Sequence, residues 1–460
     1  MNAALHDRAY LAALIAQLEE GLLERDSAVR LALLAALAGE HVLLIGPPGT
    51  AKSELARRLH RAFAGARYFE RLLTRFSTPE ELFGPLSLKA LEHDRYERLV
   101  DGYLPTASVA FLDEVFKANS AILNALLTLL NEREFDNGSA RVRAPLISVV
   151  GATNEVPAEE ALMAFYDRFL VRVPVAGVSD EAFAALLTLD ARPQAPALPI
   201  APEALHEALA QRDRVALPDE VLAGLGALRG FCGSHGIVVS DRRWRQLVGL
   251  LRSAAYTEGR TAVDALDLWL VPYVVAAQPA QVATLHDWFV TEVAQAALQD
   301  APWLTRAVEA FEKQLEIELS MPAEGGDDSA GKLALARSIG GAKDDGMLRI
   351  VSAALEETMR RRWSPVHVAA RLAQVDEVAA RAAQPLDGLR GALATLEGTL
   401  TGRVWLPPSL AATLLGNRRQ TLAKLEALLA RLTGVRDGFA ALPVDETLAP
   451  AEPAPIAIGA

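Results

Sequence analysis

The fold of this chain is decided by the stretch His41-Val42-Leu43-Leu44-Ile45-Gly46-Pro47-Pro48-Gly49-Thr50-Ala51-Lys52-Ser53. Its first five residues form a short, mostly apolar run that is typical of a buried parallel strand. A glycine- and proline-containing turn follows and leads into the helical pattern Glu54–Phe63. Strand, loop and helix in this order, with a Lys-Ser pair at the start of the helix, predict a phosphate-binding loop. The alternative, a simple glycine-proline turn, does not account for the Lys-Ser pair.

The loop has the groups that a nucleoside triphosphate needs. Backbone N–H groups of the loop and of the helix N-terminus can point at the β-phosphate. Lys52 can contact the β- and γ-phosphates, and the Ser53 hydroxyl can bind Mg²⁺. Ala51 stands where the general pattern has glycine, and alanine fits there if its φ is negative. We therefore predict ATP and Mg²⁺ as ligands of the binding loop formed by Gly46, Pro47, Pro48, Gly49, Thr50, Ala51, Lys52 and Ser53.

Further strand-like runs are Tyr68–Leu73, Val109–Leu112 and Leu146–Ala152, with helical stretches between them. This alternation predicts a parallel α/β sheet. The second run ends in Asp113 and Glu114. We expect Asp113 to hold Mg²⁺, mostly through water, and Glu114 to act as the general base that polarises the attacking water. An Asp-Glu pair is also common at the start of a helix.

Three polar side chains further along the chain are candidates for the same site. Asn154 follows the Leu146–Ala152 run and can position the water or touch the γ-phosphate, although asparagine is also a common turn residue. Arg168 is a candidate arginine finger for a neighbouring subunit, and its alternative role is an ion pair with Asp167. Arg242 or Arg243 can close onto the γ-phosphate, and the alternative interpretation of this segment is a helix N-terminus capped by Ser240 or Asp241.

Composition limits the function classes. The 460 residues include 46 basic and 58 acidic ones, so the net charge is −12. Proteins that coat a phosphate backbone usually carry the opposite sign, so a nucleic-acid partner is unlikely on this ground. The single cysteine, Cys232, excludes an internal disulfide, and no apolar run reaches the length of a membrane span. We expect a cytoplasmic protein without a membrane span.

The pattern along the chain predicts several domains. Residues 1–190 read as an α/β nucleotide-binding core, and a proline-rich connector covers 190–202. Residues 203–300 read as an all-helical domain and 301–440 as a helical C-terminal extension with a loop near 321–346. Two leucine stripes on either side of Pro407-Pro408 predict a helical hairpin there. The Pro- and Ala-rich tail 441–460 is expected to be disordered.

In this order the motifs resemble the MoxR branch of the AAA+ superfamily. The matching segments are Gly46–Ser53, where Ala-Lys-Ser is usual in this branch, Phe111–Ala118, Asn124–Arg133, Ala152–Glu155 (sensor 1) and Tyr166–Phe169 (the finger). Ser240–Trp244 looks most like sensor 2 of the RavA subgroup, with Arg242 as our choice and Arg243 as the alternative. The resemblance covers roughly residues 10 to 290.

The resemblance implies an AAA+ αβα P-loop core with a parallel sheet and a helical lid, assembled as a homo-oligomeric ring, usually a hexamer. It also implies ATP hydrolysis, chaperone-like remodelling of a client protein that the sequence does not identify, and a partner with a von Willebrand factor A domain. Two insertions are expected to touch the client: a hairpin with its turn at Asp136–Ser139, marked by Asn-Gly, and a second one over residues 84–100. Plain surface hairpins without a client contact are the alternative for both. RavA proteins with known partners carry a β-rich inserted domain, whereas residues 300–460 read as helical here.

Two other functions are compatible with parts of the sequence. A nucleic-acid motor would use basic clusters such as Arg360–Trp363, which solvated helix faces explain equally well. A scaffold that binds ATP and hydrolyses it slowly would need no base, and Glu114 argues against it. The full set of catalytic side chains favours an ATP-hydrolysing ring.

Overall fold

The computed structural model describes residues 5–189, 198–294, 302–321 and 361–458. The chain divides into two compact units. The first contains residues 1–296 together with 399–414, and the second contains 297–398 with 415–460. Residues 190–197 of the expected connector and 322–346 of the expected loop lie outside the described residues.

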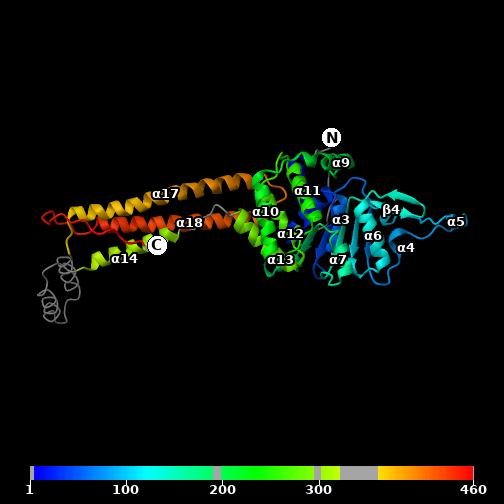
Figure 1. Cartoon of the computed structure of the whole chain (residues 1–460), viewed down its shortest axis with the longest axis horizontal. Helices are drawn as coiled ribbons and strands as arrows, with labels where there is room; N and C mark the ends of the chain where they lie inside the picture. Colours follow the sequence, from blue (N-terminus) through cyan, green and yellow to red (C-terminus); the bar gives the residue numbers. More distant parts are fainter. Residues whose placement is uncertain (1–4, 190–197, 295–301, 322–360, 459–460) are drawn as a thin grey trace. The chain divides into compact units, whose positions relative to one another are not determined.

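A five-stranded sheet forms the centre of the first unit (Figure 1), with all of its strand pairs parallel. In spatial order the strands are β2 (Tyr68–Leu72), β3 (Val109–Asp113), β6 (Ser148–Thr153), β1 (Val42–Ile45) and β7 (Val171–Pro174). The predicted α/β fold and four predicted strands are confirmed. The edge strand β7 was not predicted.

Helices cover both faces of this sheet, as an all-parallel sheet requires. The helices of this core are α1 (Arg8–Glu19), α2 (Asp26–Leu37), α3 (Lys52–Arg61), α4 (Pro79–Phe83), α5 (Leu88–Leu91), α6 (Ser120–Glu132), α7 (Glu160–Tyr166) and α8 (Asp180–Leu187), of which α5 lies away from the sheet (Figure 1) and α8 buries no residue. Helix α2 is buried along nearly its whole length. On one face of the sheet, Leu112 and Val149 pack with Leu126 of α6 and Phe165 of α7.

The two predicted insertions pack against each other. Strands β4 (Glu134–Asn137) and β5 (Ala140–Arg143) form the expected antiparallel hairpin. The segment 84–100 contains the short helix α5 and an antiparallel bridge between Leu86 and Arg98. The Asn137 side chain accepts a hydrogen bond from the Arg98 N–H (2.6 Å) and donates one to the Arg98 carbonyl (3.2 Å). The two insertions therefore form one joined projection of the core.

The predicted helical lid follows the core. Its helices are α9 (Pro202–Gln211), α10 (Asp219–Ser234), α11 (Asp241–Thr257), α12 (Val271–Val275) and α13 (Pro279–Trp288). Ser240 caps α11 by accepting a hydrogen bond from the Arg243 N–H, so the helix-start interpretation of this motif is confirmed.

The second unit is helical, as expected. It is built from α14 (Pro302–Ser320), α17 (Pro365–Thr401) and α18 (Pro408–Ala440), and the last two form the predicted hairpin. Its core includes Phe311, Val375 and Leu432. No helix in the described part of the chain is both long and apolar enough to cross a bilayer.

The C-terminal tail differs from the sequence-based expectation. Residues 441–458 were expected to be disordered, but Ile456 and Ile458 pack against the core of the second unit. The buried Arg371 donates a hydrogen bond to the Ala454 carbonyl (2.8 Å). The tail is ordered here because it covers apolar surface and supplies an acceptor to a buried cation.

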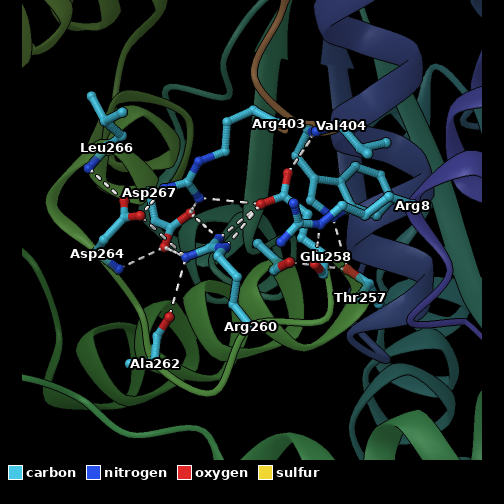
Figure 2. A network of polar contacts seen from close by, with 12 residues as sticks. Arg8, Thr257, Glu258, Arg260, Ala262, Asp264, Leu266, Asp267, Arg403 and Val404 are labelled. Carbon is cyan, nitrogen blue, oxygen red and sulfur yellow. Dashed lines mark hydrogen bonds and ion pairs between the residues drawn. The ribbon is translucent and has the colours of Figure 1, made fainter. Parts of the chain in front are cut away.

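A buried network of charges ties the turn between α17 and α18 to the lid (Figure 2). The Glu258 carboxylate at the end of α11 is 1% exposed and accepts hydrogen bonds from the Val404 and Trp405 N–H groups (2.7 and 3.1 Å). Arg403 contacts both Glu258 and Asp267 (3.1 and 3.0 Å), and Arg260 also binds Asp267. The network explains why residues 399–414 belong to the first unit.

We expect Arg403→Met to lower the free energy of unfolding of the first unit by about 3 kcal/mol, because it leaves the Glu258 carboxylate buried with one ion-pair partner fewer. Urea unfolding followed by tryptophan fluorescence measures this change. Arg141→Met is the control: Arg141 is about half exposed and pairs with surface carboxylates, so its loss should cost less than about 1 kcal/mol. Equal effects of the two substitutions would contradict the role assigned to the network.

Candidate functional site

The predicted phosphate loop begins where β1 ends. A Cβ on Gly46 would lie 1.9 Å from the Val175 carbonyl oxygen, so only glycine fits between β1 and the end of β7. The Lys52 ammonium donates hydrogen bonds to the Gly46 and Pro47 carbonyls (2.7 and 2.8 Å). Lys52 therefore lies folded over its own loop, at the position where it can meet a phosphate.

The loop presents a row of unpaired backbone donors. Within the described residues, none of the N–H groups from Gly49 to Ser53 donates a hydrogen bond. Unpaired N–H groups at a helix N-terminus bind anions, since the helix dipole adds positive potential there. The donor set fits a phosphate group, as the sequence predicts.

Ala51 differs from the expected conformation. We expected a negative φ, but its φ is +63°, in the left-handed region. The reason is that α3 starts at Lys52 and the chain must turn sharply at the residue before it. This is the role of the glycine in the general pattern, and alanine adopts the same conformation at a cost of about 1 kcal/mol.

Burial lowers the pKa of Lys52, while the nearby Asp113 and Glu114 carboxylates act in the opposite direction. Asp113 ends β3, beside the loop, and its carboxylate accepts a hydrogen bond from the Glu114 N–H (3.0 Å). The Ser53 hydroxyl makes no hydrogen bond within the described residues. A hydroxyl and a carboxylate facing one phosphate loop are suitable ligands for Mg²⁺.

Glu114 and Asn154 meet across neighbouring strands. The Asn154 amide nitrogen lies 2.5 Å from Glu114 Oε1, and the Lys117 ammonium lies 3.3 Å from Oε2. Glu114 directly follows β3 and has a φ of +52°, in the left-handed region. The structure thus brings together Glu114, Asn154, Asp113 and the loop, as expected for neighbouring parallel strands that end at one edge of the sheet.

The two candidate arginines lie near the amino-terminal ends of the strands, opposite the ends that carry the phosphate loop. Arg168 precedes β7, whose first residue, Val171, pairs with Val42 at the start of β1. Arg168 makes no ion pair with Asp167, which instead binds Arg243 and Arg172 (3.0 and 3.4 Å). The Arg168 Nε atom is buried and has no hydrogen-bond partner in the part of the chain that the structure describes. Arg168 therefore does not reach the phosphate loop of its own chain.

Arg242 also lies away from the loop of its own chain. It donates a hydrogen bond to Asn131 near the end of α6 (3.2 Å) and its charge acts on Glu40, which precedes β1. Arg243 is 3% exposed, and its guanidinium binds Asp167 and the carbonyls of Leu170 and Val274. Arg243 holds the lid on the core, and Arg242 is the exposed arginine of the pair.

Sequence reasoning missed two features beside the loop. One is a cavity of about 640 Å³ next to it, lined by residues of the segments 21–25 (including Arg25), 47–58 (the loop and the start of α3) and 177–189. The other is Arg25, whose guanidinium binds the Thr50 carbonyl within the loop (3.2 Å). Neither has a sequence signal, because the cavity joins three distant segments and a backbone carbonyl is present at every residue.

Comparisons with known proteins agree with this geometry. Residues 9–207 match a family model described as the MoxR domain in the MoxR-vWA-beta-propeller ternary systems, and residues 220–289 match an AAA lid domain. Two uncharacterized proteins of Methanocaldococcus jannaschii, MJ0079 and MJ0812, are each 42% identical to this chain. The alignments cover 56% of this chain and 68% of MJ0079, and 57% of this chain and 70% of MJ0812.

A crystal structure of a candidate ATPase from Cytophaga hutchinsonii is also similar, with a TM-score of 0.49 and 17% identity over 60% of this chain and 93% of that chain. The family assignment comes from the two domain matches, which agree with the order of the core and the lid along this chain and with the motifs placed at its phosphate loop. The chain belongs to the MoxR family of AAA+ ATPases.

Proposed function

We propose that this protein hydrolyses ATP in a homo-oligomeric ring, usually a hexamer in related proteins, and uses the energy to remodel a partner protein. The observation that carries the proposal is the position of Glu114 and Asn154, hydrogen-bonded to each other at the sheet edge where the row of unpaired loop N–H groups lies. A phosphate-binding loop with a carboxylate and an amide beside it can bind the γ-phosphate and orient a water molecule for attack on it.

The residues of the candidate site have separate roles in this proposal. The N–H groups of Gly49–Ser53 bind phosphate oxygens, and Lys52 leaves its two carbonyls for the β- and γ-phosphates. Glu114 accepts the proton of the attacking water, and Asn154 orients that carboxylate. Mg²⁺, held by Ser53 and Asp113, would neutralise charge that develops on the phosphates. The 640 Å³ cavity accommodates the base and sugar of the nucleotide.

The position of Arg168 supports a site shared between subunits. Arg168 lies near the amino-terminal ends of the strands and the loop lies at their carboxyl-terminal ends, which supports a role for Arg168 at the nucleotide of a second copy. Its buried, unpartnered Nε atom supports a contact made only in the assembled ring. Arg242 is exposed at the same edge and is our second candidate for a contact with the neighbour's nucleotide.

The partner proposal rests on the family match. The matching model is named for MoxR-vWA-beta-propeller systems, which supports a von Willebrand factor A domain protein as the partner. Within the family we place the chain close to the RavA subgroup on the Ser240–Trp244 motif. The joined projection of segment 84–100 and the β4–β5 hairpin exposes Leu88, Leu91 and Tyr96, which supports contact with a client there.

We expect Glu114→Gln to lower ATP turnover by roughly 10²-fold or more while nucleotide binding is retained, because glutamine keeps the shape of the side chain but cannot accept the proton. Phosphate release and equilibrium binding of a fluorescent ADP analogue measure the two effects. Glu132→Gln, an exposed carboxylate at the end of α6, is the control and should leave both unchanged. Turnover that survives in the Glu114 variant would remove Glu114 as the base.

We expect Arg168→Ala to abolish hydrolysis alone and to recover part of it when mixed with Glu114→Gln subunits, because in mixed rings some interfaces combine an intact Glu114 with an intact Arg168. Turnover measured across mixing ratios tests this. Arg67→Ala is the control: among the described residues the Arg67 guanidinium forms an ion pair only with the exposed Asp101, and its loss should not change turnover. If no mixing ratio restores activity, Arg168 does not act between subunits.

A further inference from the structure

Arg25 lies at the centre of three backbone segments. It is 7% exposed and immediately precedes α2. Its Nε donates to the Thr50 carbonyl (3.2 Å), Nη2 to the Ala176 carbonyl (2.6 Å) and Nη1 to the Glu24 carbonyl (2.8 Å). One guanidinium thus joins the start of α2, the phosphate loop and the connection between β7 and α8.

This arginine has no carboxylate partner, although a glutamate stands next to it. Arg25 forms no ion pair within the described residues. The carboxylate of Glu24 is turned toward Ser179, where it accepts hydrogen bonds from the backbone N–H (2.8 Å) and from the hydroxyl. Glu24 has a left-handed φ of +54°, a conformation that disfavours non-glycine residues. Glu24 and Arg25 therefore bind different groups although they are neighbours in the chain. All three hydrogen bonds of the Arg25 guanidinium are donated to backbone carbonyls.

The bond to Thr50 determines the direction of a donor in the phosphate loop. The peptide bond between Thr50 and Ala51 is trans, as all described peptide bonds are. In a trans peptide the carbonyl and the following N–H point in opposite directions. When Arg25 holds the Thr50 carbonyl, the Ala51 N–H is therefore directed away from Arg25. That N–H belongs to the row of unpaired donors from Gly49 to Ser53.

The same peptide precedes the strained residue of the loop. Ala51 has a φ of +63°, a conformation that glycine adopts freely and alanine disfavours. Without an external contact, an alanine loop would lower its energy by rotating this peptide, and the Ala51 N–H would then leave the cradle. Arg25 is the side chain that contacts the Thr50 carbonyl.

We propose that Arg25 is a positioning residue of the phosphate loop, which holds the Thr50–Ala51 peptide in the orientation that presents the Ala51 N–H to a nucleotide phosphate. The inference rests on the proposed nucleotide-binding function and assigns a role to a residue outside the loop motif. It explains how this chain uses alanine at a position where a left-handed conformation is needed: the contact with Arg25 compensates for the strain that glycine would avoid.

Binding of a fluorescent ADP analogue to the full chain tests the proposal in two backgrounds. With Ala51 in place, Arg25→Met should weaken binding about 10-fold, because a charge-assisted hydrogen bond that orients the loop is lost. In the Ala51→Gly background the same substitution should weaken binding only about 2-fold, since glycine holds the left-handed conformation without help. Arg25→Lys, which keeps the charge but not the planar fork, should fall between these values with Ala51 present.

Glu24→Gln is the matched control. It changes the neighbouring side chain of the same turn and leaves the Arg25–Thr50 bond in place, so it should not weaken ADP binding, while thermal unfolding reports any general loss of stability in every variant. Equal losses for Arg25→Met in both backgrounds, or full rescue by Arg25→Lys, would indicate a direct charge contact with the nucleotide and overturn the proposal. If the unmodified protein binds no nucleotide, the proposed function fails as well. If it binds and the loss is independent of residue 51, only this inference fails.

Discussion

The turn from β1 into α3 is the constraint on which the rest of the structure depends. A run of backbone N–H groups has no acceptor there among the described residues, and unpaired donors are costly unless water or an anion reaches them. The turn is possible because Gly46 packs directly against the Val175 carbonyl and Ala51 adopts a left-handed conformation. The strands on either side bring Asp113, Glu114 and Asn154 to the same edge. The fold thus gathers two carboxylates and an amide beside the row of unpaired N–H groups.

Several arginines lie near the opposite, amino-terminal ends of the strands. Arg243 and Arg172 bind Asp167 and nearby carbonyls, and so fix the lid to the end of α7. Arg168 lies within this same segment, with a buried Nε atom that has no acceptor. The proposed contact of Arg168 with a neighbouring subunit would therefore start from a segment that these hydrogen bonds already hold in place.

The order of the core and the position of its phosphate loop were predictable because they depend on local patterns. Short apolar runs alternate with helical periods, and the parallel strands place their carboxyl ends together whatever the details. Strand β7 was missed because Arg172 interrupts its apolar run. In the structure that guanidinium is buried over the Tyr166 ring, 3.8 Å from its centroid, and donates to the Ala276 carbonyl. A strand that contains a buried charged residue is difficult to recognise from the sequence when the partner of that residue comes from a distant segment.

The sequence by itself determined the phosphate loop, the Asp113-Glu114 pair and the α/β order, since each is encoded in neighbouring residues whose types and spacing suffice. Tertiary structure alone decided the left-handed φ of Ala51, the hydrogen bond between Glu114 and Asn154, the burial of Arg243 rather than Arg242, and the contact of Arg25 with the loop. The physical reason is that these features depend on backbone carbonyls and on side chains far apart in the chain. Every residue offers a carbonyl, so only the folded path of the backbone determines which one an arginine meets.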